Sequence, residues 1–516
     1  MQKGYKLLLI GIFIGIYLFL TAWVFVPIVR AWPLLSPKNQ VIGKLPDLKP
    51  IIVLYKDPFL CLLELRNREV AIPWLVISSL IVIAITIWIA WERWNERIFH
   101  PTEKKTKRPK VHMPNHTADA TAIGISDNGK PIYIPDNARH VFVAGTTGSG
   151  KTIALSNFVE NGLAKGYGML IIDGKGDTGP RSLIDYCCRM SIRYGRQIHI
   201  IGGPSSNAKY NPFRNSKETE AKDMLISMTE WSEPHYRANV ERYIQSLIQL
   251  LLIADIPLSY DVIIENMSKT AYETLSAQLV RENKITKEDH IANLAISSVS
   301  SDITASATAR FATIVEGEGN SIFSADGIDV YTALATGDII FFCLSPLLYP
   351  SFASSLGRLA VLDARKAVSR MWGDHKPKFF IFDELGAYVS PMLVTLLSQA
   401  RAATVTCIAA TQSFADLEAA GTSMRRQVVE NCNSFIIMRQ NSPEDAQQAA
   451  DIIGTYEDMD ITYQLSEQKQ TGLGSARRVR QYFFHPDVIK NLCVGEAVFV
   501  SKETGQRSKV WIRKPE

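Results

Sequence analysis

Residues 141–152 read VFVAGTTGSGKT, and this stretch decides the fold. An apolar run suited to a buried strand leads directly into a glycine-rich turn that ends in a lysine and a threonine. The turn matches the phosphate-binding pattern G-x-x-x-x-G-K-[ST], and a helical pattern follows it. A glycine-rich turn that fits by chance is the alternative, but it rarely has a strand before it and a helix after it. The stretch therefore predicts a loop that binds a nucleoside triphosphate.

The residues of this phosphate-binding loop have separate expected roles. They are Gly145, Thr146, Thr147, Gly148, Ser149, Gly150, Lys151 and Thr152. The three glycines free the backbone to curl tightly, so that several N–H groups point inward. We expect Lys151 to contact the β- and γ-phosphates of ATP and Thr152 to offer its hydroxyl to Mg2+.

A second strand delivers two adjacent carboxylates. Residues 378–384 read KFFIFDE, an apolar run that ends in Asp383 and Glu384. Ligands of open α/β sheets lie beyond the carboxyl ends of the parallel strands, so we expect both carboxylates beside the phosphates. Asp383 is the candidate for holding Mg2+ through water, and Glu384 for orienting or deprotonating the attacking water. An acidic turn that caps the next helix is the alternative, but together with the phosphate-binding loop the pair predicts a nucleoside triphosphatase.

Two long apolar segments precede this region, at about residues 7–29 and 71–91. Each has the roughly 20 residues that a helix needs to cross a bilayer. A cleaved signal peptide is the alternative for the first, but the segment is too long and no small-x-small cleavage site follows it. Residues 1–95 are therefore predicted to form a membrane anchor with two transmembrane helices and a short outer loop. A basic juxtamembrane linker is predicted over 96–135.

Charge does not decide how the anchor is oriented. Basic residues occur both in the outer loop and after the second span, so the positive-inside rule is indecisive. ATP is cytoplasmic, and the phosphate-binding loop therefore places the bulk of the chain in the cytoplasm. The net charge of +5 permits nucleic-acid binding without showing it, since no stripe of aromatic and basic residues stands out.

Strand-like runs alternate with helical patterns through the rest of the chain, which indicates a doubly wound, mostly parallel sheet of the α/β class. Only helical periodicity fills residues 217–312. We therefore expect an all-helical domain there, inserted into a nucleotide-binding domain made of residues 136–216 and 313–516. Residues 466–480 are polar, basic and contain glycine, which is typical of a mobile loop.

Six motifs occur in one order over nearly all of the part after the anchor. They are GTTGSGKT at 145–152, IIDGKGD at 171–177, YNPF at 210–213, FFIFDELG at 379–386, LLSQARAATVTCIAATQS at 396–413 and FIIMRQNSPEDA at 435–446. In this order, and with two N-terminal spans before them, they resemble the coupling proteins of type IV secretion systems, which are related to the FtsK–HerA class of DNA translocases. The resemblance implies a RecA-like P-loop NTPase domain.

The resemblance also implies a function and an assembly. Six subunits would form a ring around a channel in the bacterial inner membrane, with ATP between neighbours. The homo-hexamer would be an ATPase that couples single-stranded DNA with an attached relaxase to the components of a type IV secretion channel. A receptor and docking platform for effector proteins is the alternative. A chromosome translocase is less favoured, because such proteins have more spans and a winged-helix module, and neither is found.

Two further residues are candidates for the ATP site shared between neighbours. Gln412 follows the strand predicted at 405–410, where its amide could reach the γ-phosphate or the attacking water; an ordinary strand-end glutamine is the alternative. Arg401 lies 18 residues after Asp383, and its position in the family implies an arginine finger that reaches a neighbour's phosphates. A solvated arginine at a helix end is the alternative for it, and Arg439 is a weaker candidate for the same task.

Asp173 and Lys175 belong to the second motif of the series, at the end of another strand-like run. The sequence assigns them no chemical step.

Overall fold

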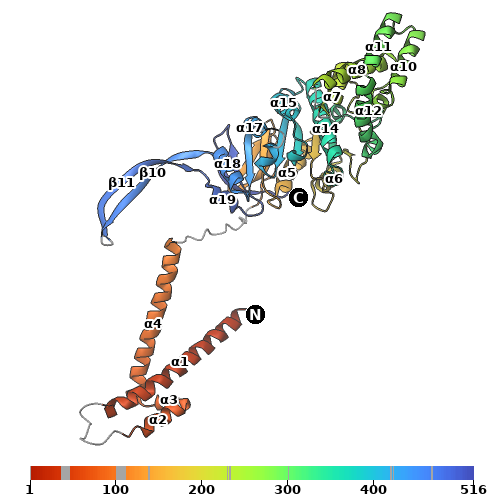
Figure 1. The fold of residues 1–516 in the computed structure, drawn as a ribbon. Helices are drawn as coiled ribbons and strands as arrows, with labels where there is room; N and C mark the ends of the chain where they lie inside the picture. The colour runs from red at the N-terminus through yellow and green to blue at the C-terminus, as the bar shows by residue number, and fades with distance from the viewer. Residues whose placement is uncertain are drawn as a thin grey trace. The chain divides into compact units, whose positions relative to one another are not determined.

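The computed structural model (Figure 1) describes residues 2–35, 47–99, 112–137, 140–228, 231, 234–299, 301–418, 421, 423–466 and 469–515. The basic run KKTKRPK at 104–110 lies outside the described residues. The chain divides into two compact units, Met1–Thr106 and Lys107–Glu516.

The first unit consists of helices. They are α1 (Gln2–Leu35), α2 (Lys49–Lys56), α3 (Pro58–Glu64) and α4 (Arg68–Phe99). Two segments are long and apolar enough to cross a membrane, Gly15–Pro33 in α1 and Arg68–Glu92 in α4. Only 17% of each segment is buried within the protein, whereas the core helix of a soluble domain would be mostly buried. These exposed apolar helices are the two candidate spans that the sequence predicts.

The two short helices between them pack against α1. The indole Nε1 of Trp23 in α1 donates a hydrogen bond to the carbonyl oxygen of Tyr55 in α2 at 3.2 Å. Arg30 near the end of α1 forms an ion pair with Glu64 in α3. These two short helices are thus folded onto the end of the first candidate span.

The second unit is built on an 11-stranded sheet with the order β2-β1-β13-β12-β9-β3-β8-β7-β4-β6-β5. The strands are β1 (Ala120–Ser126), β2 (Pro131–Pro135), β3 (His140–Ala144), β4 (Met169–Asp173), β5 (Ile198–Ile201), β6 (Ile339–Cys343), β7 (Lys378–Asp383), β8 (Val405–Thr411), β9 (Cys432–Met438), β12 (Glu496–Ser501) and β13 (Arg507–Ile512). The strands from β9 to β5 are mutually parallel, and the remaining four continue the sheet antiparallel. The predicted mostly parallel α/β fold is confirmed.

Helices cover both faces of the sheet, because alternate strand residues point in opposite directions. In β4, Leu170 and Ile172 join one hydrophobic cluster, and Met169 and Ile171 join another. The helices that pack against the second cluster are α5 (Lys151–Lys165) and α6 (Leu183–Tyr194). Those that pack against the first are α13 (Val330–Thr336), α14 (Pro350–Arg370), α15 (Pro391–Gln399), α16 (Phe414–Glu418), α17 (Met424–Glu430), α18 (Pro443–Ile453) and α19 (Pro486–Lys490). Burial on both faces explains why the strands read as continuous apolar runs.

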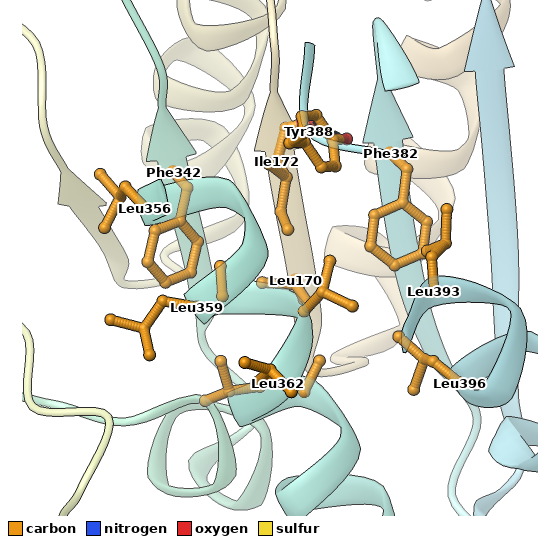
Figure 2. Packing of buried hydrophobic residues seen from close by; sticks show 14 of the residues in the cluster. Leu170, Ile172, Phe342, Leu356, Leu359, Leu362, Phe382, Tyr388, Leu393 and Leu396 are labelled. Carbon is orange, nitrogen blue, oxygen red and sulfur yellow. Dashed lines mark hydrogen bonds between the residues drawn. The ribbon is translucent and has the colours of Figure 1, made fainter. Parts of the chain in front are cut away.

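Leucines of α14 and α15 fill the first of these clusters (Figure 2). Leu359 of α14 lies over Phe342 of β6, and Leu393 of α15 lies over Phe382 of β7. All four side chains are fully buried. Full burial of one such side chain contributes about 1.5–3 kcal/mol, so these contacts hold the carboxylate-bearing strand β7 firmly in the sheet.

The segment between β5 and β6 is helical, as predicted, and joins the sheet domain at both ends. Before α13, its helices are α7 (Glu218–Ser227), α8 (Pro234–Ile253), α9 (Tyr260–Glu265), α10 (Lys269–Arg281), α11 (Lys287–Val299), α12 (Ser301–Glu316) and the short 3-10 helix Glu318–Ser321. No strand occurs among the described residues of this segment.

Two segments differ from the sequence-based expectation. The sequence indicates a linker over 96–135, but β1 and β2 lie within it and belong to the large sheet. β1 pairs with β13 near the other end of the chain, with Gly124 opposite Ile512. This long-range pairing leaves no local signal. The β1–β2 hairpin does leave one, the Asn128-Gly129 pair in its turn, so the linker prediction missed a signal that was present.

The predicted mobile loop at 466–480 is also wrong for the residues that the structure describes. β10 (Thr455–Ser466) and β11 (Lys469–Tyr482) form an antiparallel hairpin, which we call the arm. Acidic residues of β10 oppose basic residues of β11, for example Glu457 opposite Arg480. Opposite charges across a strand pair are stabilising, so the polar composition favours a hairpin rather than a loop.

A buried polar network explains the YNPF motif. The Tyr210 hydroxyl donates to Asp363 Oδ2 of α14 at 3.1 Å. Lys366 Nζ lies 3.1 Å from Asp363 Oδ1 and 3.6 Å from Asp329 Oδ2, and it donates to the carbonyl oxygen of Pro212. Tyr210 lies where the chain leaves the sheet for the helical segment, and Asp329 lies where it returns. The network therefore ties both connections to α14.

Lys366→Ala should destabilise the protein by about 3–5 kcal/mol, because it leaves buried carboxylates without their counter-ion. Lys287→Ala, at an exposed position of α11, is the control and should change stability by less than about 0.5 kcal/mol. Urea unfolding of both variants in detergent checks this. Equal midpoints for Lys366→Ala and the control would show that the network does not stabilise the fold.

Candidate functional site

The carboxyl ends of the parallel strands meet at one edge of the sheet. Ala144, the last residue of β3, is in register with Thr411 at the end of β8, and Asp173 of β4 is in register with Asp383 of β7. The N–H of Gly145 donates to the carbonyl oxygen of Thr411 at 3.2 Å. The structure therefore brings the phosphate-binding loop to the same edge as Asp383, Glu384 and Gln412.

The geometry of the phosphate-binding loop requires its glycines. Gly148 and Gly150 have φ angles of +75° and +112°, which strain residues with a side chain. A Cβ on Gly145 would lie 2.6 Å from Ser149 Oγ and 2.8 Å from Met438 Cβ, so there is no room for one. Helix α5 begins at Lys151, directly after this turn. Its unpaired N–H groups and positive dipole end make the loop a site for an anion.

Lys151 and Glu384 form an ion pair across the site, with 3.1 Å between Nζ and Oε2. Glu384 holds a left-handed backbone conformation with φ of +53°, which is strained for a residue with a side chain. Its N–H donates to Asp383 Oδ1 at 3.0 Å. A terminal phosphate would compete with the Glu384 carboxylate for Lys151, so phosphate binding would free that carboxylate.

Residues that directly follow β8 and β9 brace the loop. The Thr147 hydroxyl donates to Gln412 Oε1 at 2.8 Å, and the Thr146 N–H donates to the Arg439 carbonyl at 2.9 Å. Asn441 Nδ2 donates to Thr146 Oγ1 at 3.3 Å. Asn441 is not singled out by the sequence. Its one signal is its place just after the end of β9, the neighbour of β3 in the sheet.

Two buried carboxyl groups lie side by side at the ends of β4 and β7. Burial, and then the neighbouring Asp383, raise the pKa of Asp173 to about 7. Burial raises the pKa of Asp383 to about 6, although Lys151 acts to lower it. A divalent cation would offset this concentration of negative charge, and Mg2+ prefers such oxygen ligands. Thr152, in the first turn of α5, offers a hydroxyl at the same edge, so the residues present fit Mg2+.

Asp173 also organises the loop that follows it. Its Oδ1 accepts hydrogen bonds from the N–H groups of Lys175 at 2.9 Å and Gly176 at 3.3 Å. Lys175 Nζ pairs with Asp177 Oδ2 at 2.8 Å. This carboxylate thus fixes its own loop beside Asp383 and contacts no predicted phosphate-binding residue.

The raised pKa values of these carboxyl groups make the stability of the nucleotide-free protein pH-dependent. The ordinary pKa of an aspartate is about 3.9, so between about pH 4 and pH 7 the folded protein retains protons that the unfolded chain releases. Stability therefore falls as pH rises through this window. Asp173→Asn keeps the acceptor oxygen but removes the charge.

Asp173→Asn should exceed the wild type in unfolding free energy by on the order of 2–4 kcal/mol at pH 8, and the two should converge towards pH 4. Denaturant unfolding in EDTA at both pH values measures this. A difference between the two proteins that is the same at both pH values would contradict the assignment.

Arg401 lies at the opposite end of β8 from Gln412. It belongs to the short 3-10 helix Ala400–Ala403 that leads into the strand, and the seven residues of β8 separate the two by roughly 20 Å. Arg401 is exposed and lines a cavity of about 450 Å³ together with Asp136, Tyr167 and His375. The structure does not bring Arg401 to the phosphate-binding loop of its own chain.

Arg439, the weaker candidate, lies at the end of β9 on the side of the loop. Its Nε is buried and has no hydrogen-bond partner among the residues that the structure describes.

Known proteins are similar to the part of the chain that carries this site. Residues 377–492 match the family described as the TraM recognition site of TraD and TraG. This segment contains both carboxylates, Arg401, Gln412 and the arm. The second unit has the fold of the bacterial conjugative coupling protein TrwB: the unbound form of TrwBdeltaN70 has a TM-score of 0.55 and 16% identity, covering 79% of this chain and 90% of that one. Residues 377–492 are thus similar to a segment of TraD and TraG, and the second unit has the TrwB fold.

Two nucleotide complexes of TrwB have the same fold as this chain. The complex with a non-hydrolysable ATP analogue has a TM-score of 0.56 and 16% identity, and covers 78% of this chain and 91% of that one. The complex with ADP and Mg2+ has a TM-score of 0.52 and 16% identity, with coverage of 77% and 89%. An uncharacterised protein of Mycoplasma pneumoniae is 30% identical over 135 residues, which are 25% of this chain and 87% of that one.

Proposed function

We propose that this chain is a type IV coupling protein, an ATPase of the bacterial inner membrane that passes single-stranded DNA with an attached relaxase to a type IV secretion channel. The observation that carries the proposal is the meeting of Lys151 and Glu384 at 3.1 Å beside the buried Asp383. A lysine, an acid and a metal-binding carboxylate at the edge of a parallel sheet are the parts that phosphoryl transfer needs.

Each residue of the site has a distinct task in this proposal. The backbone of residues 145–150 and Lys151 hold the phosphates of ATP, and Glu384 orients the attacking water and accepts its proton. Mg2+, held by the hydroxyl of Thr152 and through water by Asp383, would neutralise charge that develops on the phosphates. Gln412, which bonds to Thr147, places its side chain where it can contact the water or the γ-phosphate.

The chain works as a homo-hexamer in this proposal, with ATP between neighbours. The position of Arg401 supports this shared site. The residue is exposed, and it lies roughly one strand length from the phosphate-binding loop of its own chain, so it is placed to serve another chain. An arginine finger supplied by a neighbour stabilises the transition state of phosphoryl transfer. The site in one chain is then incomplete, and each subunit completes the site of the next.

The membrane and the channel set the direction of transfer. Both apolar helices, in α1 and α4, cross the inner membrane and keep the ATPase in the cytoplasm. The likeness to a conjugative coupling protein supports DNA as the cargo, and the family described by its TraM recognition site supports an accessory protein at the cytoplasmic face. The channel components then meet the anchor.

Single-stranded DNA should stimulate ATP hydrolysis by the full-length protein in detergent, and Lys151→Ala should abolish both basal and stimulated hydrolysis. Lys151 is the positive charge that its own chain places for the terminal phosphates, whereas Lys287→Ala, on the helical segment, should behave as the wild type. Phosphate release with and without oligonucleotide measures this.

Hydrolysis that DNA leaves unchanged, but that an effector protein stimulates, would contradict DNA as the cargo and favour an effector receptor. Full hydrolysis by Lys151→Ala would contradict the proposed site itself.

A further inference from the structure

The arm is a free-standing hairpin. Its strands have 12 and 14 residues, paired from Thr455 opposite Tyr482 to Ser466 opposite Lys469. Neither strand pairs with any other strand among the described residues. Figure 1 shows the arm extending from the sheet domain beside α18 and α19.

The base of the arm is fixed to the sheet domain. The hydroxyl of Tyr482 donates to Asp451 Oδ1 of α18 at 2.9 Å. The rings of Tyr456 and Phe483 lie 5.2 Å apart, and the guanidinium of Arg507 lies 4.5 Å from the centre of the Phe483 ring. These contacts come from both strands of the arm, so its direction is set by the body of the protein.

Both outer edges of the arm are open. An isolated two-stranded hairpin is only marginally stable in water, and its edges offer unpaired N–H and C=O groups to another strand. The large sheet protects its own edges. β2 begins and ends with Pro131 and Pro135, and the outer side of β5 is covered because the N–H groups of Asn207 and Ala208 donate to Ile200.

The two open edges carry opposite charges. β10 carries the acidic residues Glu457, Asp458 and Asp460, and the same part of β11 carries Arg477, Arg478 and Arg480. Glu457 lies opposite Arg480, and Asp460 lies opposite Arg477. All six side chains are exposed. The acidic edge of one arm is therefore complementary to the basic edge of another arm, but neither edge is complementary to itself.

We propose that the arms of neighbouring copies of this chain pair edge to edge, with β10 of one copy beside β11 of the next. A head-to-tail contact of this kind generates a ring where its rotation closes, and closure removes the open edges. The proposal rests on the ring-shaped assembly of the proposed function and adds a specific contact to it. Nucleic acid fits the arm less well, because the acidic strand lies about 4.8 Å from the basic one and would repel phosphates.

Charge reversal on one strand tests the pairing. One variant carries Glu457→Arg, Asp458→Arg and Asp460→Arg; the other carries Arg477→Glu, Arg478→Glu and Arg480→Glu. Each alone should self-associate at least tenfold more weakly than the wild type, since both edges of its arm then have the same charge. Mixed in equal amounts, the two variants should recover association, because the basic edges of one meet the acidic edges of the other.

The mixture separates contacts between chains from contacts within one hairpin. Each chain in the mixture still has like charges inside its own arm, so recovery requires pairing with the other chain. Glu265→Arg, Glu288→Arg and Glu316→Arg, at exposed positions of the helical segment, form a matched control that should associate as the wild type. Particle mass of the full-length proteins in detergent, over a concentration series, measures association without relying on hydrolysis.

Two outcomes would overturn the proposal. One is a mixture that associates no better than either variant alone. The other is normal association of both variants with loss of single-stranded oligonucleotide binding by the β11 variant, which would make the arm a nucleic-acid contact. Neither outcome bears on hydrolysis at the phosphate-binding loop, so the proposed function is tested separately.

Discussion

The candidate site depends on the parallel pairing of β3, β8, β7 and β4. This pairing carries Lys151 and Glu384, which are 233 residues apart in the chain, to within 3.1 Å of one another. It also places the buried carboxyl groups of Asp173 and Asp383 side by side. The electrostatic cost of this arrangement would change on binding of a cation and a phosphate. The helices on both faces hold the strands in register through fully buried leucine and phenylalanine side chains, so the stability of the core and the geometry of the site have the same origin.

Local patterns predict the parts of the protein that have local causes. The strand, turn and helix around Gly145–Thr152 follow from glycine conformations and apolar runs, and the carboxyl-end rule for parallel strands places Asp383 beside them. The pairing of β1 with β13 and the bond from Asn441 to the loop join distant parts of the chain. No periodicity records them, and they could not be predicted from one sequence.

The environment of polar residues leaves the weakest trace in the sequence. The arm has the composition of a loop, and only the alignment of Glu457 with Arg480 and of Asp460 with Arg477 shows why it forms a hairpin. Lys366 in α14 gives no sign in the sequence that it lies buried between carboxylates. In both cases the local structure depends on the oppositely charged residue that a side chain contacts, and that residue lies elsewhere in the chain.

The central claim is that the two ends of β8 serve different ATP sites. Gln412, at one end, serves the site of its own subunit, and Arg401, at the other end, serves the site of a neighbour. Mixing Arg401→Ala with Glu384→Gln tests it most directly. Each variant alone should bind ATP but hydrolyse it hardly at all, since a finger is worth about 10³–10⁵ in rate. Hydrolysis should return in mixed hexamers, because an Arg401→Ala subunit keeps an intact Glu384 that a neighbour's arginine can serve. No recovery at any mixing ratio, with mixed assembly confirmed, would contradict the account.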